Sequence, residues 1–291
     1  MTALVVVTAG CGPEGVEVTG PTTTVTTVVD APVQGGTGDA GDQQPPQEEQ
    51  PPAEARPDAG REAFDRIVAS LPAGTGVAVA PVGSAQEPLV GGDLTSDVAW
   101  STIKVPLALA TLRASPDLGP AADRALTVSD NDAAETLWAA LGGGAGAAAA
   151  VGAVLAEAGD PGTVVPSERL RPGYSIFGQT VWPLTGQARF GAGLACLADG
   201  PLVLGPMTRI DPSQRWGLGG IPGAAFKGGW GPTADGSGYL VRQFGLLPTP
   251  NGRVAVAVAA YGGDFGGGTA LLSQIADTVA AELGELPAGE C

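Results

Sequence analysis

Apolar residues recur every three or four positions in several stretches of the chain after residue 60. Between Arg61 and Leu71 they stand at Ala63, Phe64, Ile67, Val68 and Leu71. Residues three and four apart share one face of an α-helix, so this spacing predicts a helix. The same spacing predicts helices over 121–126, 133–141, 182–197 and 269–283, and a further helix inside the alanine- and glycine-rich segment 142–159.

Short apolar runs bounded by turn residues predict five strands, at 76–82, 87–91, 224–229, 238–247 and 253–261. Strands therefore stand at both ends of the folded part, and helices lie between them. This order predicts an α/β or α+β sandwich in which an antiparallel five-stranded sheet is packed with helices. The segment 159–180 has no periodicity and contains three prolines, which predicts a long ordered loop.

Composition divides the chain near residue 60. Residues 12–60 are poor in large apolar side chains and rich in threonine, proline and glutamine, which predicts a disordered linker before a folded domain at 61–291. The apolar run 4–7 and the Thr8-Ala9-Gly10-Cys11 that follows it resemble a bacterial lipobox, so that residues 1–11 are a signal remnant. The resemblance implies export and an extracytoplasmic lipid anchor on the cell membrane at Cys11. The alternative is a disordered N-terminus with an incidental cysteine.

Charge and cysteine content narrow the function classes. The net charge of −16 and the lack of a basic cluster argue against nucleic-acid binding. No apolar stretch reaches the length of a membrane-spanning helix. Without histidine and with scattered cysteines the chain has no zinc ligand set, so we expect no metal, no cofactor and, by default, a monomer. Cys196 lies in an apolar helical pattern and is expected to be a small core residue, although a disulfide with Cys291 stays open.

Candidate chemistry begins at Ser101 and Lys104, at the start of an apolar run that continues to about Arg113. On a helix these two side chains lie on one face, so the amine can reach the hydroxyl. A serine nucleophile needs a base, and a chain without histidine cannot build a Ser-His-Asp triad. Lysine is the remaining base, and the chain has only Lys104 and Lys227. Pro106 lacks an amide proton and fits best if the helix begins a residue or two past Ser101.

Two further motifs accompany this pair. Ser129-Asp130-Asn131 precedes a predicted helix, and Lys227 lies at the end of a predicted strand. Alone, the first can be a helix cap and the second a solvated strand end. The order Ser-x-x-Lys, Ser-Asp-Asn, Lys-x-Gly is, however, the motif set of serine β-lactamases and penicillin-binding proteins. On these residues the chain resembles that superfamily, most closely its class A β-lactamase branch, over about residues 61–285.

The resemblance implies roles for the polar residues. Ser101 is the nucleophile that becomes acylated, and Lys104 accepts or relays its proton. Ser129 passes a proton to the leaving nitrogen, and Asn131 hydrogen-bonds Lys104 and the substrate amide. Lys227 positions Ser129 and attracts a substrate carboxylate. A lysine can act as a base at neutral pH only if burial or a nearby positive charge lowers its pKa, and the second lysine would supply such a charge.

The resemblance also implies a substrate site. The amides of Ser101 and Trp230 would form an oxyanion hole, and Gly229 and Arg242 are the other expected substrate-binding residues. An exposed strand arginine is the alternative for Arg242. Trp230 and Trp182 can line the cleft, although a buried tryptophan is the common case.

The chain departs from the family pattern in three places. Gly228 stands where a hydroxyl would meet a substrate carboxylate. Ser129 follows Ser101 after only 28 residues, which implies a reduced all-helical subdomain and a more open cleft. No Glu-x-x-Leu-Asn occurs in 159–180, where class A enzymes carry the deacylating glutamate. Glu168 is the one candidate deacylation base, with a solvated loop carboxylate as its alternative.

Three functions are therefore left open. The first is a serine hydrolase of the β-lactamase/penicillin-binding fold, acylated at Ser101 by a β-lactam or a peptide-like amide, such as a peptidoglycan peptide. The second is a penicillin-binding D-alanyl-D-alanine peptidase-like enzyme with slow deacylation. The third is a non-catalytic binding lipoprotein that keeps the fold.

Overall fold

The structure is a computed structural model, and it describes residues 59–291. The predicted signal remnant with Cys11 and nearly all of the predicted linker 12–60 lie outside the described residues. The last two positions of that predicted linker already belong to the first helix, α1 (Ala59–Ala69).

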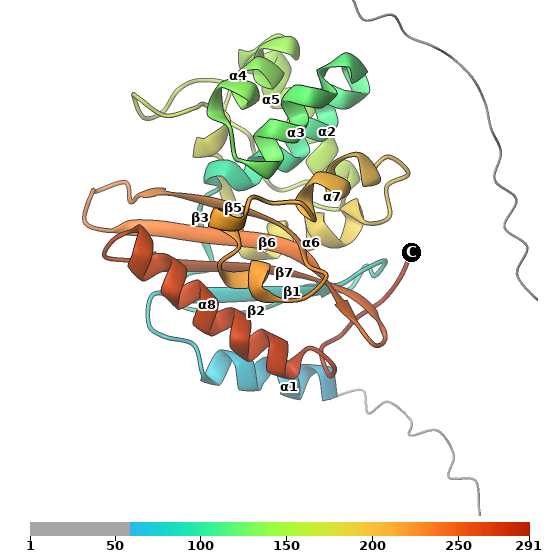
Figure 1. Cartoon of the computed structure of the whole chain (residues 1–291), viewed down its shortest axis with the longest axis vertical. Helices are drawn as coiled ribbons and strands as arrows, with labels where there is room; N and C mark the ends of the chain where they lie inside the picture. The colour runs from blue at the N-terminus through green and yellow to red at the C-terminus, as the bar shows by residue number, and fades with distance from the viewer. Residues whose placement is uncertain (1–58) are drawn as a thin grey trace, which may run out of the picture. The chain divides into compact units, whose positions relative to one another are not determined.

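A five-stranded antiparallel sheet forms the centre of the described part (Figure 1). The spatial order β2-β1-β7-β6-β5 joins the two N-terminal strands to the three C-terminal ones. The strands are β1 (Thr75–Pro81), β2 (Leu89–Gly92), β5 (Ala225–Pro232), β6 (Tyr239–Thr249) and β7 (Gly252–Gly262). Each overlaps a strand predicted from the sequence. The predicted α+β class and antiparallel five-stranded sheet are confirmed.

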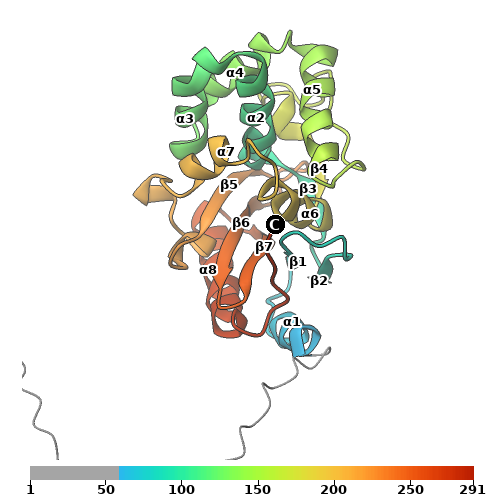
Figure 2. The same cartoon turned by 90° about the vertical axis from the view of Figure 1, so that its right-hand side faces the viewer.

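Helices cover both faces of the sheet. α1 and α8 (Phe265–Glu282) lie on one face, and α6 (Leu184–Leu194) packs on the other (Figure 1). The remaining helices form a group on the side of β5 (Figures 1 and 2). They are α2 (Lys104–Ala114), α3 (Gly119–Thr127), α4 (Asn131–Ala140), α5 (Gly144–Glu157) and α7 (Pro201–Met207). Short 3-10 turns are η1 (Trp100–Ile103), η2 (Pro116–Leu118), η3 (Phe177–Gln179), η4 (Pro212–Gln214) and η5 (Gly217–Gly220).

The central strand β7 contributes to two separate cores through its period of two. Its valines, at 254, 256 and 258, face the core beneath α1 and α8. Its alanines, at 255, 257 and 259, face the core shared with α6 and the helical group. The small alanines let α6 come close: a Cβ placed on Gly191 would stand 3.2 Å from the methyl of Ala255. The alternation of valine and alanine along β7 thus lets α6 pack closely on the alanine face of the sheet.

Some elements leave no readable pattern in the sequence. A second, two-stranded sheet pairs β3 (Ser96–Val98) with β4 (Val181–Pro183). The helix predicted from residue 182 begins instead at Leu184, because Trp182 pairs with Asp97 in that sheet. Strands of three residues are too short to show a periodicity, and the same holds for the seven-residue helix α7.

The cysteine expectation needs a correction. Cys196 is exposed and forms a disulfide with Cys291, with a Cα–Cα distance of 5.3 Å. α6 ends at Leu194, so Cys196 leaves the helical pattern that suggested a core position. The bond ties the end of the chain to the segment after α6.

Membrane and metal features can be assessed only within the described residues. There, no individual helix is both long and apolar enough to cross a membrane, although α4 and α5, bent by 97°, meet that test as a pair. The described part also contains no cluster of three or more acidic or cysteine side chains suited to holding a metal ion.

Candidate active site

Ser101 lies half-buried in η1, which leads directly into α2 at Lys104. Pro106 therefore stands in the first turn of α2, where its missing amide proton breaks no helical hydrogen bond. Trp100, just before the serine, has a φ of 48°. A left-handed backbone is strained for a bulky residue and costs about 1–3 kcal/mol. The turn must therefore be held in place by its surroundings.

One face of β5 lies against this turn. Lys227, Gly229 and Gly231 alternate along the strand and so share that face. A Cβ at Gly229 would lie 2.8 Å from the amide nitrogen of Ser101, and one at Gly231 would lie 2.4 Å from the Trp100 ring. Because a side chain at either position would clash, the two glycines let the edge strand touch the turn.

The loop before α4 supplies the next group. Ser129 has a φ of 58°, and Asp130 caps α4 by accepting a hydrogen bond from the Ala133 amide at 3.0 Å. Lys104 Nζ donates to the carbonyl oxygen of Ser129 at 2.6 Å and to Oδ1 of Asn131 at 2.8 Å. The motif therefore caps a helix and also binds the lysine of α2.

Both lysines reach the same hydroxyl. Lys227 Nζ lies 3.0 Å and Lys104 Nζ 3.4 Å from Ser129 Oγ. Lys227 is 0% exposed, which excludes a solvated strand end, and it also donates to the carbonyl of Gly228 at 2.9 Å. Within residues 59–291, no hydrogen bond joins Lys104 to Ser101. The hydroxyl of Ser129 thus lies between the two amines.

Burial sets the protonation state of the lysine pair. It lowers the pKa of Lys104 to about 7, against the opposing effect of Asp130 and Glu135. Burial, followed by repulsion from Lys104, lowers the pKa of Lys227 well below its usual value. Of the two expected causes, burial and the charge of the second lysine, burial is the main one for both lysines. At neutral pH a substantial share of Lys104 is the neutral amine that a base must be.

Comparison with known proteins gives a fold. No protein-family model and no curated protein sequence matches the chain. The TLA-1 extended-spectrum β-lactamase matches with a TM-score of 0.58 at 16% identity, over 78% of this chain and 98% of its own. A class A β-lactamase from Bacteroides cellulosilyticus DSM 14838 matches with a TM-score of 0.58 at 16% identity, over 77% and 98%. PBP-A matches with a TM-score of 0.55 at 21% identity, over 80% and 98%.

The chain has the fold of the serine β-lactamase and penicillin-binding protein superfamily. The identities of 16–21% make this a statement about the fold alone. Within this β-lactamase-like fold, hydrogen bonds bring Lys104, Ser129, Asn131 and Lys227 together as the motif order predicts. Ser101 is placed beside them by its backbone, which lies against Gly229 of the strand that carries Lys227.

Arg242 requires a correction in this β-lactamase-like fold. Its side chain is 0% exposed, and its guanidinium donates to the carbonyls of Asp97, Val98 and Trp182 and to Oε1 of Gln187. A buried guanidinium with these partners cannot also bind a substrate. Both sequence alternatives, a substrate ligand and an exposed strand arginine, are therefore wrong.

The tryptophans also lie elsewhere than a cleft wall requires. The ring of Trp230 packs against Trp216 and Phe265, with centroids 5.9 and 5.3 Å away, on the face of β5 opposite Gly229. Only the Trp230 amide is left as a candidate for the oxyanion hole. Trp182 is 0% exposed, and its Nε1 donates to Asp160 at 2.8 Å.

The loop between α5 and β4 offers no carboxylate to the site. Glu168 is exposed and makes no hydrogen bond or ion pair with other described residues. Asp160 is the other carboxylate of this loop, and it is buried against Trp182. This placement favours the solvated alternative for Glu168.

Sequence reasoning missed the contacts that fasten this loop. Arg171 donates to the carbonyls of Pro232 and Thr233 at 3.2 and 3.4 Å, and its Cζ lies 4.7 Å from the ring centroid of Tyr174. Tyr174 packs edge-on against Trp100, with centroids 5.1 Å apart. The loop is thus joined to the end of β5 and to the turn that carries the serine. The alternate glycines of β5 were the available signal, because they mark a strand face against which another segment packs closely.

Proposed function

We propose that this protein is a serine hydrolase that takes an acyl group from a β-lactam or a peptide-like amide onto Ser101. The observation that carries the proposal is the hydroxyl of Ser129 held between the amines of Lys104 and Lys227. Two buried lysines around one hydroxyl are costly to build for stability alone. They suit proton transfer during the opening of an amide bond.

The proposed reaction gives each of these groups one step. Ser101 Oγ attacks the carbonyl carbon, and its proton passes to neutral Lys104. The negative charge on the carbonyl oxygen is met by the amides of Ser101 and Trp230. As the C–N bond breaks, the hydroxyl of Ser129 gives its proton to the leaving nitrogen and regains one from Lys104. The product of this half-reaction is an ester on Ser101.

Release of the ester is the step that separates two candidate functions. An exposed Glu168 and a buried Asp160 leave the ester without a nearby carboxylate base in the described part of the loop. This arrangement favours slow deacylation, as in a penicillin-binding D-alanyl-D-alanine peptidase-like enzyme. Efficient hydrolysis would need a base from elsewhere or a movement of the loop.

Export and lipid anchoring at Cys11 are a separate proposal. The disulfide Cys196–Cys291 supports it, because such bonds persist in oxidising compartments outside the cytoplasm. Radiolabelled palmitate should enter the wild-type protein and not Cys11→Ser. Equal labelling of both would overturn the anchor.

Intact mass spectrometry tests the enzymatic proposal. Wild type should gain the mass of benzylpenicillin, and Ser101→Ala should not. A long-lived adduct with little turnover of a chromogenic cephalosporin supports the slow-release enzyme, whereas rapid turnover that Glu168→Gln abolishes supports the hydrolase. Neither an adduct nor turnover with any β-lactam or D-alanyl-D-alanine peptide would leave the non-catalytic binding lipoprotein as the remaining function.

A further inference from the structure

A chain of buried hydrogen bonds leads from β6 to the turn of the nucleophile. Arg242 Nη2 donates to Oε1 of Gln187 on α6 at 2.6 Å. Nε2 of Gln187 donates to Oγ1 of Thr102 at 2.8 Å. Thr102 Oγ1 in turn donates to the carbonyl of Ala99 at 2.6 Å. The side chains of Arg242, Gln187 and Thr102 are all 0% exposed.

The same guanidinium fixes the chain on the other side of the turn. Arg242 Nη1 donates to the carbonyls of Asp97 and Val98 at 2.6 and 3.0 Å, on β3. Its Nη2 also donates to the carbonyl of Trp182 at 2.7 Å, on β4. Arg242 thus holds the backbone just before the turn, and through Gln187 it holds the residue just after the serine.

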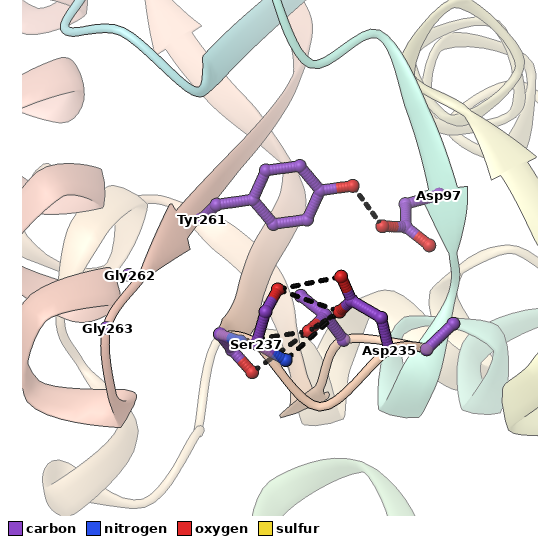
Figure 3. Close-up of a pocket in the computed structure, with 9 residues that line it drawn as sticks. Asp97, Asp235, Ser237, Tyr261, Gly262 and Gly263 are labelled. Atoms are coloured by element: carbon purple, nitrogen blue, oxygen red, sulfur yellow. Dashed lines mark hydrogen bonds between the residues drawn. The ribbon is translucent and has the colours of Figure 1, made fainter.

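The outer end of this network reaches a cavity of about 600 Å³ (Figure 3). Figure 3 shows Tyr261 pointing toward Asp97, and its hydroxyl donates to Asp97 Oδ2 at 2.5 Å. Asp97 is also the negative charge that acts on the buried Arg242. On the other side of the cavity, the carboxylate of Asp235 accepts hydrogen bonds from the hydroxyls of Thr233 and Ser237, which belong to the same turn. Asp97 and Tyr261, at the outer end of the network, therefore line this cavity.

The directions of these hydrogen bonds are dictated by chemistry. A guanidinium can only donate, so Arg242 must face the oxygen of the Gln187 amide. The amide nitrogen of Gln187 then faces Thr102, which must accept, and the threonine proton is left for the carbonyl of Ala99. Each member sets the orientation of the next.

The network costs stability, which calls for another role. Arg242 stays charged at neutral pH, because burial lowers its pKa only to about 10, and its Nε has no partner among the described residues. Buried charged networks are commonly less stable than apolar packing of the same volume. This one converges on residues 97–102, which contain the strained Trp100.

We propose that Gln187 is a positioning residue for Ser101, which it holds through Thr102 while Arg242 orients its amide. The proposal rests on the proposed function of Ser101 as the acylated nucleophile. Loss of the Gln187 bridge leaves the strained turn free to relax, and Ser101 then moves relative to Lys104 and to Gly229. Small misplacements of a nucleophile are enough to slow a reaction on the order of 100-fold.

Four variants test the bridge. Gln187→Leu and Thr102→Val remove it with little change of volume, whereas Thr102→Ser keeps the hydroxyl. Gln243→Leu is the matched control: Gln243 is also 0% exposed, but its amide bonds to Trp216 and Leu218. We expect the acylation rate constant with benzylpenicillin to fall about 10- to 100-fold in Gln187→Leu and Thr102→Val, with little change in half-saturating concentration. Thr102→Ser and Gln243→Leu should acylate like wild type per folded molecule.

Hydrogen exchange gives a readout that does not depend on chemistry. The amides of residues 98–103 should exchange faster in Gln187→Leu and Thr102→Val, and unchanged in Gln243→Leu. The proposal would be overturned if Gln187→Leu acylated and exchanged its amides at the wild-type rates and differed only in a lower unfolding midpoint. If wild type itself is never acylated, the proposed function fails, and exchange at 98–103 alone then decides whether Gln187 holds the turn.

Discussion

At the residue scale, the lysine pair shows where a chain without histidine can hold the base that the proposed function needs. Lys104 and Lys227 are 1% and 0% exposed, and both meet Ser129. Desolvation favours the neutral amine, which is the form that accepts a proton. The motif identified these residues, but only their burial accounts for their chemistry.

The pH dependence of acylation follows from Lys104. Its pKa of about 7 means that the neutral base is scarce at acid pH and dominant at alkaline pH. The acylation rate constant should rise from about pH 5 to about pH 9, with a midpoint near 7. Stopped-flow acylation with a β-lactam measures this profile. A rate independent of pH over that range would exclude Lys104 as the base.

Replacing Lys227 should separate stability from function. Lys227 is 0% exposed, and its amine makes no ion pair in the described part of the chain, so the burial of its charge opposes folding. Because its pKa in the folded state lies below the unfolded value, this penalty eases as pH rises toward about 10. Lys227→Met should raise the unfolding free energy at pH 7 by about 1–2 kcal/mol and abolish acylation. Urea unfolding at two pH values checks both signs, since the gain should shrink at alkaline pH.

Gly229 should tolerate no side chain. The added Cβ would stand 2.8 Å from the backbone nitrogen of Ser101, so the turn that carries Ser101 would have to move away from β5. Gly229→Ala should therefore lower the acylation rate on the order of 10-fold or more. Gly205→Ala is the control, because nothing lies within 4 Å of its added Cβ. Equal rates for the two variants would contradict the close approach of β5.

At the scale of elements, the short interval between Ser101 and Ser129 has a simple structural counterpart. The chain leaves α2 at Ala114 and returns to Ser129 through η2 and α3 alone. A three-residue 3-10 turn and one nine-residue helix thus fill most of the connection. That this part is reduced relative to class A enzymes stays a prediction of the spacing.

Two helix caps make a matched test of the Ser129 loop. Asp130 caps α4 and Asp264 caps α8, each by accepting from a backbone amide. Asp130→Ala and Asp264→Ala should each lower the unfolding free energy by about 1 kcal/mol. Only Asp130→Ala should also slow acylation, because Lys104 hydrogen-bonds the carbonyl oxygens of Ser129 and Asp130 and Oδ1 of Asn131. Asp130→Asn, which preserves a capping oxygen, should restore both the unfolding free energy and the acylation rate. If Asp130→Ala lowered stability alone, the Ser129 loop would not contribute to acylation.

At the scale of the whole molecule, the disulfide joins residues 95 positions apart. Closing a loop of that length restricts the unfolded chain, so its removal should cost about 2–4 kcal/mol. Urea unfolding of Cys196→Ser/Cys291→Ser measures the loss, and reductant should lower the midpoint of wild type alone. Acylation should stay at the wild-type rate at moderate temperature, because neither cysteine takes part in the hydrogen bonds of the site. A parallel loss of acylation would indicate that the tie also supports the site.

The sequence by itself determined the five strands of the main sheet, most of the helices and the set of motifs around Ser101, Ser129 and Lys227. Periodicity is a local property, and the order of Ser101, Ser129 and Lys227 along the chain carries its own information. The positions of Lys104 and Lys227 around the hydroxyl of Ser129 agree with that order.

Only the tertiary structure decided the surroundings of these residues. Arg242 has partners 55 and 145 residues away, so no local pattern could show that it is buried. The same reason applies to the pairing of β3 with β4, to the disulfide and to the Gln187 bridge. The face on which Trp230 packs was set by strand alternation relative to a neighbour, the Ser101 turn, that lies more than a hundred residues away. These features arise from contacts between distant segments, and they determine where Ser101 lies.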